Sequence, residues 1–207
     1  MAAPGFMGKI SRWFGGASDT YFFGLQIAVK SFGEDTVRAG FARVLEDTRS
    51  DSSNVNEKRR LIRRFAALLE QSELFWTYGY WEYMDQADSA REEFDTWRDE
   101  IEGSIATEEE ELHEEVDDLR RTSSRKDYVV VTLAFLLDGP YRAAEAVVSE
   151  DAAFLKDTFS ALVQGLTAID PRTIQADATY VVPGNEDDGL SEDDLLDPGW
   201  NHLRILL

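Results

Sequence analysis

The chain has 207 residues, which suits one domain with a short appended segment. Its 41 acidic and 21 basic residues give a net charge of −20, which disfavours binding to nucleic acids and to anionic membranes. The absence of cysteine excludes disulfides, thiolate catalysis and cysteine-based metal centres. Because the sequence shows neither a run of ~18 apolar residues nor a signal-peptide core, we expect a cytoplasmic protein.

Residues 1–20 form a glycine-punctuated leader, which we expect to be an arm distinct from a domain at residues 21–207. Its large apolar residues recur at helical spacing: Phe6, Met7, Ile10, Trp13 and Phe14. One interpretation is an amphipathic helix that contacts a membrane surface or a partner. The other is a flexible arm, or an arm packed on its own domain, that folding does not require. We expect membrane contact only through this leader.

The first elements of the domain are a strand and two helices. Residues 25–30 alternate apolar and polar side chains, which is typical of a strand with one buried face. Residues 37–45 and 61–69 have the apolar spacing of amphipathic helices. The other face of the second helix is basic and carries Lys58, Arg59, Arg60, Arg63 and Arg64.

An aromatic segment follows, SELFWTYGYW at residues 72–81. Its five aromatic side chains carry large apolar surfaces, so they are either buried in a core or presented to a partner. We predict that they are mainly core, with a bend at Gly79 that turns both Trp76 and Trp81 inward. If the segment is instead exposed, Trp76, Tyr80 and Trp81 form the binding site.

The rest of the chain alternates helices and strands. Residues 81–121 predict one long charged helix, with a bend or break near Gly103. Residues 128–137, YVVVTLAFLL, are apolar on both faces and indicate a central strand. A helix over 149–169 and an alternating strand over 174–182 complete the pattern. We predict an α+β domain whose amphipathic helices pack on a three-stranded antiparallel sheet.

Four stretches carry a resemblance to a known family. They are GLQIAV from Gly24, the helix and aromatic segment LIRRFAALLEQSELFWTYGYW with AREEF after it, the strand YVVVTLAFLL, and the tail ATYVVPGNEDDGLSEDDLL. The chain resembles a bacterial and chloroplast domain family of unknown function that includes fluctuating-light-acclimation-type thylakoid proteins. The resemblance implies no catalytic residues and no cofactor.

Two acidic segments are candidates for cation binding. The loop at 184–194 fails the EF-hand register, which requires an oxygen ligand at position 1 and Glu at position 12, so only weak binding by its aspartates remains open. The run TEEEELHEEVDDL contains one Glu-x-x-His spacing, Glu110 with His113, whereas a di-metal carboxylate site needs two. We therefore expect no metal site and no cofactor.

The sequence favours a non-enzymatic interaction, assembly or regulatory protein with a protein partner. It shows no nucleophile motif and no phosphate-binding loop. The candidate interaction residues are Trp76, Tyr80, Trp81, Arg59, Arg60, Arg63 and Arg64. A carboxylate- or cation-dependent enzyme is the first alternative, and a peripheral membrane-associated factor acting through residues 1–20 is the second. The arginines could instead pair with the acidic helix around 108–118. The sequence leaves the pathway and the oligomeric state open.

Overall fold

A single antiparallel sheet organises the fold. The computed structural model describes residues 7–12, 19–31, 37–47, 54–113, 127–183 and 189–207. Within them the strand order is β1-β5-β4-β2-β3-β6. The strands are β1 (Met7–Arg12), β2 (Tyr21–Lys30), β3 (Trp76–Met84), β4 (Tyr128–Leu137), β5 (Ile174–Val182) and β6 (Arg204–Ile205). Five strands form the body of the sheet, because β6 adds a pairing of only two residues to β3.

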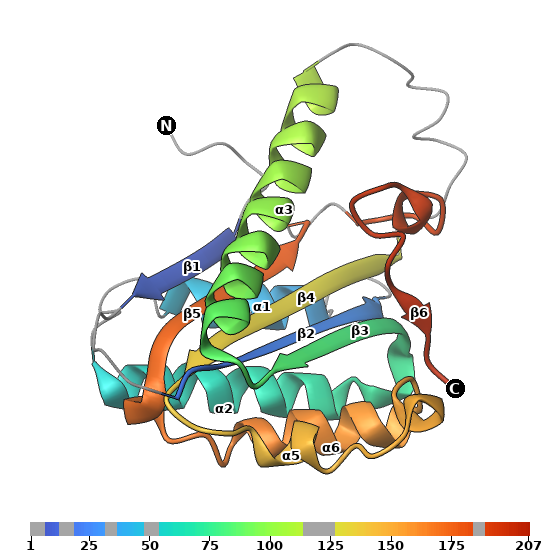
Figure 1. Cartoon of the computed structure of the whole chain (residues 1–207). Coiled ribbons are helices and arrows are strands. Elements are labelled where there is room, and N and C mark those ends of the chain that lie inside the picture. The colour runs from blue at the N-terminus through green and yellow to red at the C-terminus, as the bar shows by residue number, and fades with distance from the viewer. Residues whose placement is uncertain (1–6, 13–18, 32–36, 48–53, 114–126, 184–188) are drawn as a thin grey trace.

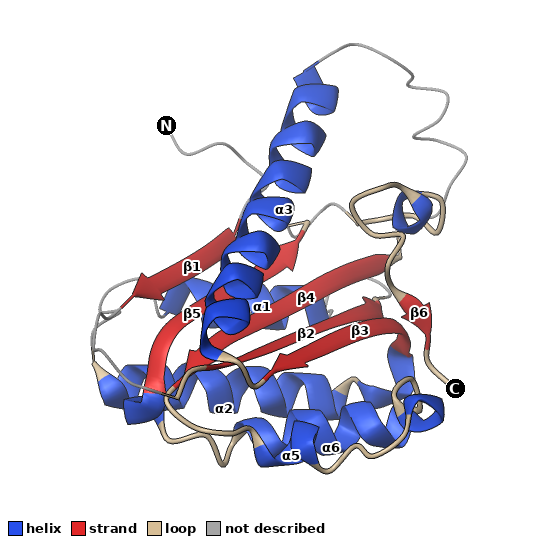
Figure 2. Ribbon diagram, viewed as in Figure 1, coloured by secondary structure: helices blue, strands red, loops and turns tan. Residues whose placement is uncertain are grey.

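Helices cover both faces of this sheet (Figures 1 and 2). They are α1 (Val37–Asp47), α2 (Val55–Gln71), α3 (Ala87–His113), α5 (Arg142–Glu145) and α6 (Lys156–Leu166). All except α3 lie on one side, which we call the lower face, and they share one apolar core with it. The upper face packs against α3 and the C-terminal segment, residues 190–203.

The predicted α+β class is confirmed, and the three predicted strands are β2, β4 and β5. β4 lies between the other two, with Lys30 opposite Tyr128 and Thr132 opposite Tyr180. The predicted number of strands is wrong, because β1, β3 and β6 extend the sheet. β2 and β5 are also buried on both faces rather than on one, because α3 and the C-terminal segment cover the upper face.

Most of the aromatic segment lies in β3, a strand that the sequence analysis did not predict. A β-bulge at Thr77 interrupts its pairing with β2, where Ala28 pairs with Tyr78 and Val29 with Trp76. The extra residue reverses the alternation, so that Trp76 joins Trp81 on the lower face although they are five residues apart. The predicted inward turn of both tryptophans is therefore correct, and its cause is a bulge rather than a bend at Gly79.

The helical interpretation of the leader is also wrong where the structure describes it. Met7–Arg12 forms β1, which pairs with β5 and places Ile10 opposite Ala178. Residues 1–6 and 13–18 of the leader lie outside the described residues. The division into an arm and a domain stays a prediction.

Helix α3 begins at Ala87, six residues later than predicted, and continues through Gly103 without a break. Its buried side chains Ala90, Phe94, Trp97 and Ile101 recur every three or four residues, so one stripe faces the sheet. Beyond this stripe the helix extends past the edge of the sheet (Figure 1).

Replacing Gly79 by alanine is expected to destabilise the protein by about 1–3 kcal/mol, the cost of overpacking a core. A Cβ at this position would lie 2.4 Å from Cε1 of Phe159. Urea denaturation measures the loss. The matched control is Gly103→Ala, where a Cβ meets nothing within 4 Å and alanine favours the helix by up to ~1 kcal/mol. Equal stability of the two variants would contradict the close packing of β3 on α6.

Candidate functional site

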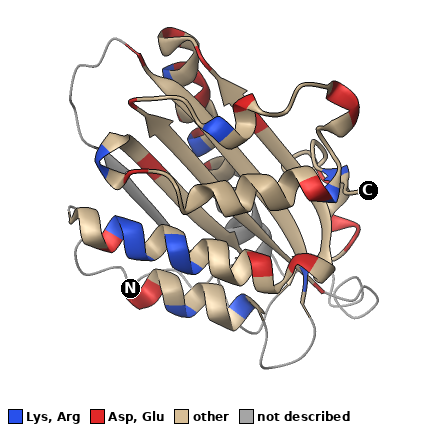
Figure 3. Ribbon diagram, turned by 90° about the horizontal axis from the view of Figure 1, so that it is seen from below, with Lys and Arg blue, Asp and Glu red and all other residues tan. Residues whose placement is uncertain are grey.

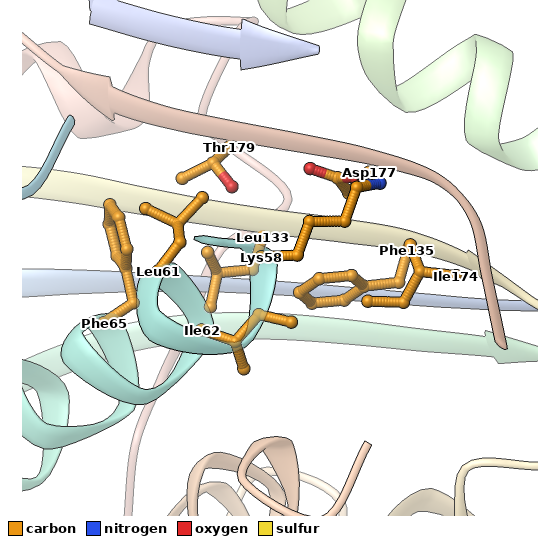
Figure 4. Close-up of a pocket in the computed structure, with 9 residues that line it drawn as sticks. All are labelled: Lys58, Leu61, Ile62, Phe65, Leu133, Phe135, Ile174, Asp177 and Thr179. Carbon is orange, nitrogen blue, oxygen red and sulfur yellow. Dashed lines mark hydrogen bonds and ion pairs between the residues drawn. The ribbon is translucent and has the colours of Figure 1, made fainter. Parts of the chain in front are cut away.

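A buried ion pair joins α2 to β5 beneath the sheet (Figure 4). Lys58 Nζ lies 2.5 Å from Asp177 Oδ1, and the two side chains are only 9% and 6% exposed. The surroundings are mostly apolar and comprise Leu61, Ile62, Phe65, Leu133, Phe135, Ile174 and Thr179. Sequence reasoning grouped Lys58 with the surface arginines. Its spacing from Leu61, Ile62 and Phe65 already placed it on the apolar side of the helix.

The cavity beside this pair has a volume of about 10 Å³. That is roughly the space for the centre of one water molecule, so the cavity is too small for an organic substrate. An ammonium and a carboxylate removed from water must compensate each other closely. We interpret the pair as a structural link between helix and sheet.

A second polar cluster lies on the upper face, where α3 crosses β3. The charge of Glu82 on β3 acts on Glu93 on α3, and we call the two residues the carboxylate pair. Glu82 Oε2 accepts hydrogen bonds from Trp97 Nε1 at 3.3 Å and from the Tyr80 hydroxyl at 3.4 Å. Burial, and after it the charge of Glu82, raises the pKa of Glu93 to about 7. One carboxyl of the pair therefore titrates near neutral pH.

The C-terminal segment completes this cluster through His202. The imidazole Nε2 contacts Gln26 Oε1, and Gln26 Nε2 donates to Thr132 Oγ1 at 3.2 Å. The Tyr80 ring meets the His202 ring edge-on, with centroids 5.2 Å apart. Burial lowers the pKa of His202, so the imidazole is neutral at pH 7. No sequence motif indicated this cluster, because its members come from segments far apart in the chain.

The three predicted aromatic interaction residues do not form one surface. Trp76 is 3% exposed and lies in the lower core. Trp81 is half-buried on the same face and donates its Nε1–H to the carbonyl of Ala153 at 2.8 Å. Tyr80 is half-buried on the opposite face, where it stacks on Trp97 with ring centroids 5.8 Å apart. Aromatic docking by all three residues together would require the sheet to open.

The four predicted arginines lie together along α2. Arg59, Arg60 and Arg63 are exposed and Arg64 is half-buried. Arg60 pairs with Glu57 at 2.6 Å, and Arg64 pairs with Asp47 on α1 at 2.9 Å. Seen from below, the basic residues cross the first half of α2 (Figure 3). α2 and α3 lie on opposite faces of the sheet (Figure 1), and residues 114–118 of the acidic segment lie outside the described residues, so pairing of the arginines with that segment stays untested.

The cation-binding interpretation of the loop at 184–194 is tested only in part, because residues 184–188 lie outside the described residues. In the remainder, Ser191 and Asp194 form a capping box: each side chain accepts from the other's backbone N–H, at 2.7 and 3.1 Å. Within the described part of the chain, no three His, Asp or Glu side chains gather as a metal site. No described helix has the length and apolarity to cross a bilayer.

The family assignment rests on residues 22–198. They match the family model described as "Protein of unknown function (DUF1517)". The chain belongs to this family. Comparison with curated proteins and with solved structures gives no match. The predicted membership of a domain family of unknown function is therefore confirmed, and its thylakoid branch stays a prediction.

Proposed function

We propose that this DUF1517 member is a non-catalytic interaction protein and that the outer surface of α2 binds an acidic segment of a partner protein. The observation that carries the proposal is the exposed row Arg59, Arg60 and Arg63. Guanidinium groups bind carboxylates through paired, charge-assisted hydrogen bonds. In a chain of net charge −20 this row is a local exception that selects an acidic partner rather than a basic one.

The architecture of α2 supports the proposal. Leu61, Ile62, Phe65 and Leu69 anchor the helix in the lower core, so its outer face is held at a fixed orientation. Arg59 and Arg63 are four residues apart and therefore neighbours on that outer face. A partner would meet a rigid surface, which lowers the entropic cost of binding.

The alternatives have weaker support. The enzymatic alternative needs a pocket that admits a substrate, and the cavity at Lys58 holds about one water molecule. The membrane alternative drew on a helix in the leader, where Met7–Arg12 is a strand. We also propose a cytoplasmic location, which composition supports. Kinship with the fluctuating-light-acclimation-type proteins is a further part of the proposal, and the four quoted stretches support it.

The test neutralises two arginines of the outer face. Arg59→Gln with Arg63→Gln is expected to weaken the affinity for a captured acidic partner about tenfold, the effect of two exposed charge pairs at up to ~1 kcal/mol each. Isothermal titration calorimetry with purified proteins measures Kd, and added salt should reduce the difference.

The control has the same change in net charge and uses exposed arginines elsewhere, Arg91→Gln with Arg142→Gln. It should leave the affinity within about twofold of the native value. If both double variants bind alike, the α2 surface is not the interface and the proposal fails.

A further inference from the structure

One side of β3 is only partly paired within the described residues. β2 pairs with its inner side from end to end. On the outer side, β6 pairs only with Tyr78 and Gly79 (Figure 1). Residues 80–84 have no backbone partner on this outer side among the described residues, and we call them the open edge.

The direction of the backbone groups identifies the free donors and acceptors. The carbonyl of Thr77 points outward, because it accepts from the Leu206 N–H at 3.0 Å. Backbone groups along an antiparallel strand alternate between its two sides. Trp81 and Tyr83 therefore direct their N–H and C=O groups away from β2, where a further strand can pair with them.

The side chains of the open edge are held on both faces of the sheet. On the lower face, Trp81 donates its Nε1–H to the carbonyl of Ala153 at 2.8 Å. The Tyr83 hydroxyl accepts from the Tyr141 N–H at 3.3 Å. On the upper face, Tyr80 stacks on a tryptophan of α3. An incoming strand would meet a backbone already fixed in the extended form, which lowers the entropic cost of binding.

The two faces of the open edge differ in chemistry. The lower face presents the rings of Trp81 and Tyr83. The upper face carries the carboxylate of Glu82, and the exposed Asp85 follows directly after the strand. Side chains of directly opposite residues lie on the same face of a sheet. An added strand therefore needs apolar residues opposite Trp81 and Tyr83 and a basic residue opposite Glu82.

We propose that the open edge binds an extended segment of a partner protein by strand addition, and that this segment alternates basic and apolar residues. Main-chain hydrogen bonds supply the affinity in this mode of binding, and alternate side chains supply the specificity. The net charge of −20 also favours a basic segment. This surface is separate from the outer face of α2 and does not depend on the partner proposed there.

A second copy of the chain fits the open edge less well. Antiparallel pairing of two such edges about Glu82 places the two Glu82 carboxylates directly opposite each other, which is destabilising. Two molecules of the same high negative charge also repel each other.

The probe is a synthetic peptide of alternating lysine and valine with blocked ends and a fluorescent label, roughly seven residues long so that it spans the open edge. Fluorescence anisotropy with the full chain measures its Kd. Hydrogen exchange followed by mass spectrometry locates the bound peptide. At about ten times Kd, the outward amides of the open edge should exchange about tenfold more slowly, and those of α2 should not change. Failure of the peptide to protect the open edge would overturn the proposal.

Two N-methylated forms of the peptide, which keep its charge, decide whether its main chain is bound. The valines lie opposite Trp81 and Tyr83, so their N–H groups face β3. Methylating the valine nitrogens removes two hydrogen bonds to β3 and should weaken binding about tenfold or more. The lysine N–H groups face away from β3, and methylating them should change Kd by less than about twofold. Equal Kd values for the two forms would show that charge alone attracts the peptide, and strand addition would be wrong.

One substitution in the protein tests the choice of a basic segment. Glu82→Gln, which can still accept from the groups that bond Glu82, should weaken peptide binding about fivefold, the effect of one exposed charge pair. The control Glu70→Gln makes the same change in net charge at an exposed position on α2 and should leave Kd within about twofold of the native value. Equal weakening in both variants would contradict a site at Glu82.

Sedimentation velocity of the free protein tests the other occupant. We expect a monomer whose open-edge amides exchange rapidly. A dimer in which these amides are already protected would show that a second copy fills the edge, and the proposal of a basic partner segment would fail.

Discussion

Replacing Lys58 by methionine is expected to lower the free energy of unfolding by about 3–5 kcal/mol, the usual cost of breaking a buried ion pair from one side. Methionine keeps most of the apolar stem and removes the ammonium group that lies 2.5 Å from Asp177. Asp177, whose side chain is 6% exposed, loses this ammonium partner in a mostly apolar environment. Urea denaturation at pH 7 measures the loss.

The double variant Lys58→Met with Asp177→Asn separates charge from packing. It removes both charges, while the introduced asparagine keeps a similar shape and the capacity to accept hydrogen bonds. We expect it to recover more than half of the stability lost in Lys58→Met. If the double variant is less stable than Lys58→Met, the cost comes from packing around the cavity and not from the broken ion pair.

Replacing Trp76 by alanine is expected to cost about 3–5 kcal/mol, because it removes a large aromatic side chain that is 3% exposed in the lower core. The adjacent aromatic residue supplies the control. Phe75 is 44% exposed, so Phe75→Ala should cost less than about 1 kcal/mol.

Thermal and urea denaturation of both variants decide between core and docking surface at Trp76. If Trp76→Ala unfolds like the native protein and loses only the binding of a partner, the aromatic segment is an interface and its placement in the core is wrong. The bulge at Thr77 would then have to direct Trp76 outward.

The strands that could be predicted from the sequence are those with the clearest apolar pattern. β4 is apolar at almost every position, and β2 and β5 carry alternating apolar residues, so all three were found. β3 was missed because its aromatics continue into the charged pattern of α3, and helical and extended spacings overlap there. β1 was missed because six residues with two apolar side chains fit either a helix or a strand.

The polar sites were harder to predict than the core. Their members lie far apart in the sequence, such as Glu82 with Glu93 and His202, or Lys58 with Asp177. Periodicity reports which side of an element faces inward and does not report which two elements meet. The one exception was Lys58, whose helical spacing placed a charge on the buried side of α2. A charged residue on the buried side of a helix indicates that a residue of opposite charge is buried beside it.

The pairing of β2 with β4 has a consequence for the order in which the chain folds. Tyr21 pairs with Leu137 and Lys30 with Tyr128, so these neighbouring strands are joined through α1, α2, β3 and α3. β4 can pair with β2 only after the long segment between them has closed into a loop. Such non-local contacts slow folding. Until then YVVVTLAFLL, apolar on both faces, has the composition that promotes strand-to-strand association between chains. Refolding yield should therefore fall as protein concentration rises, even though the finished sheet hides β4 completely.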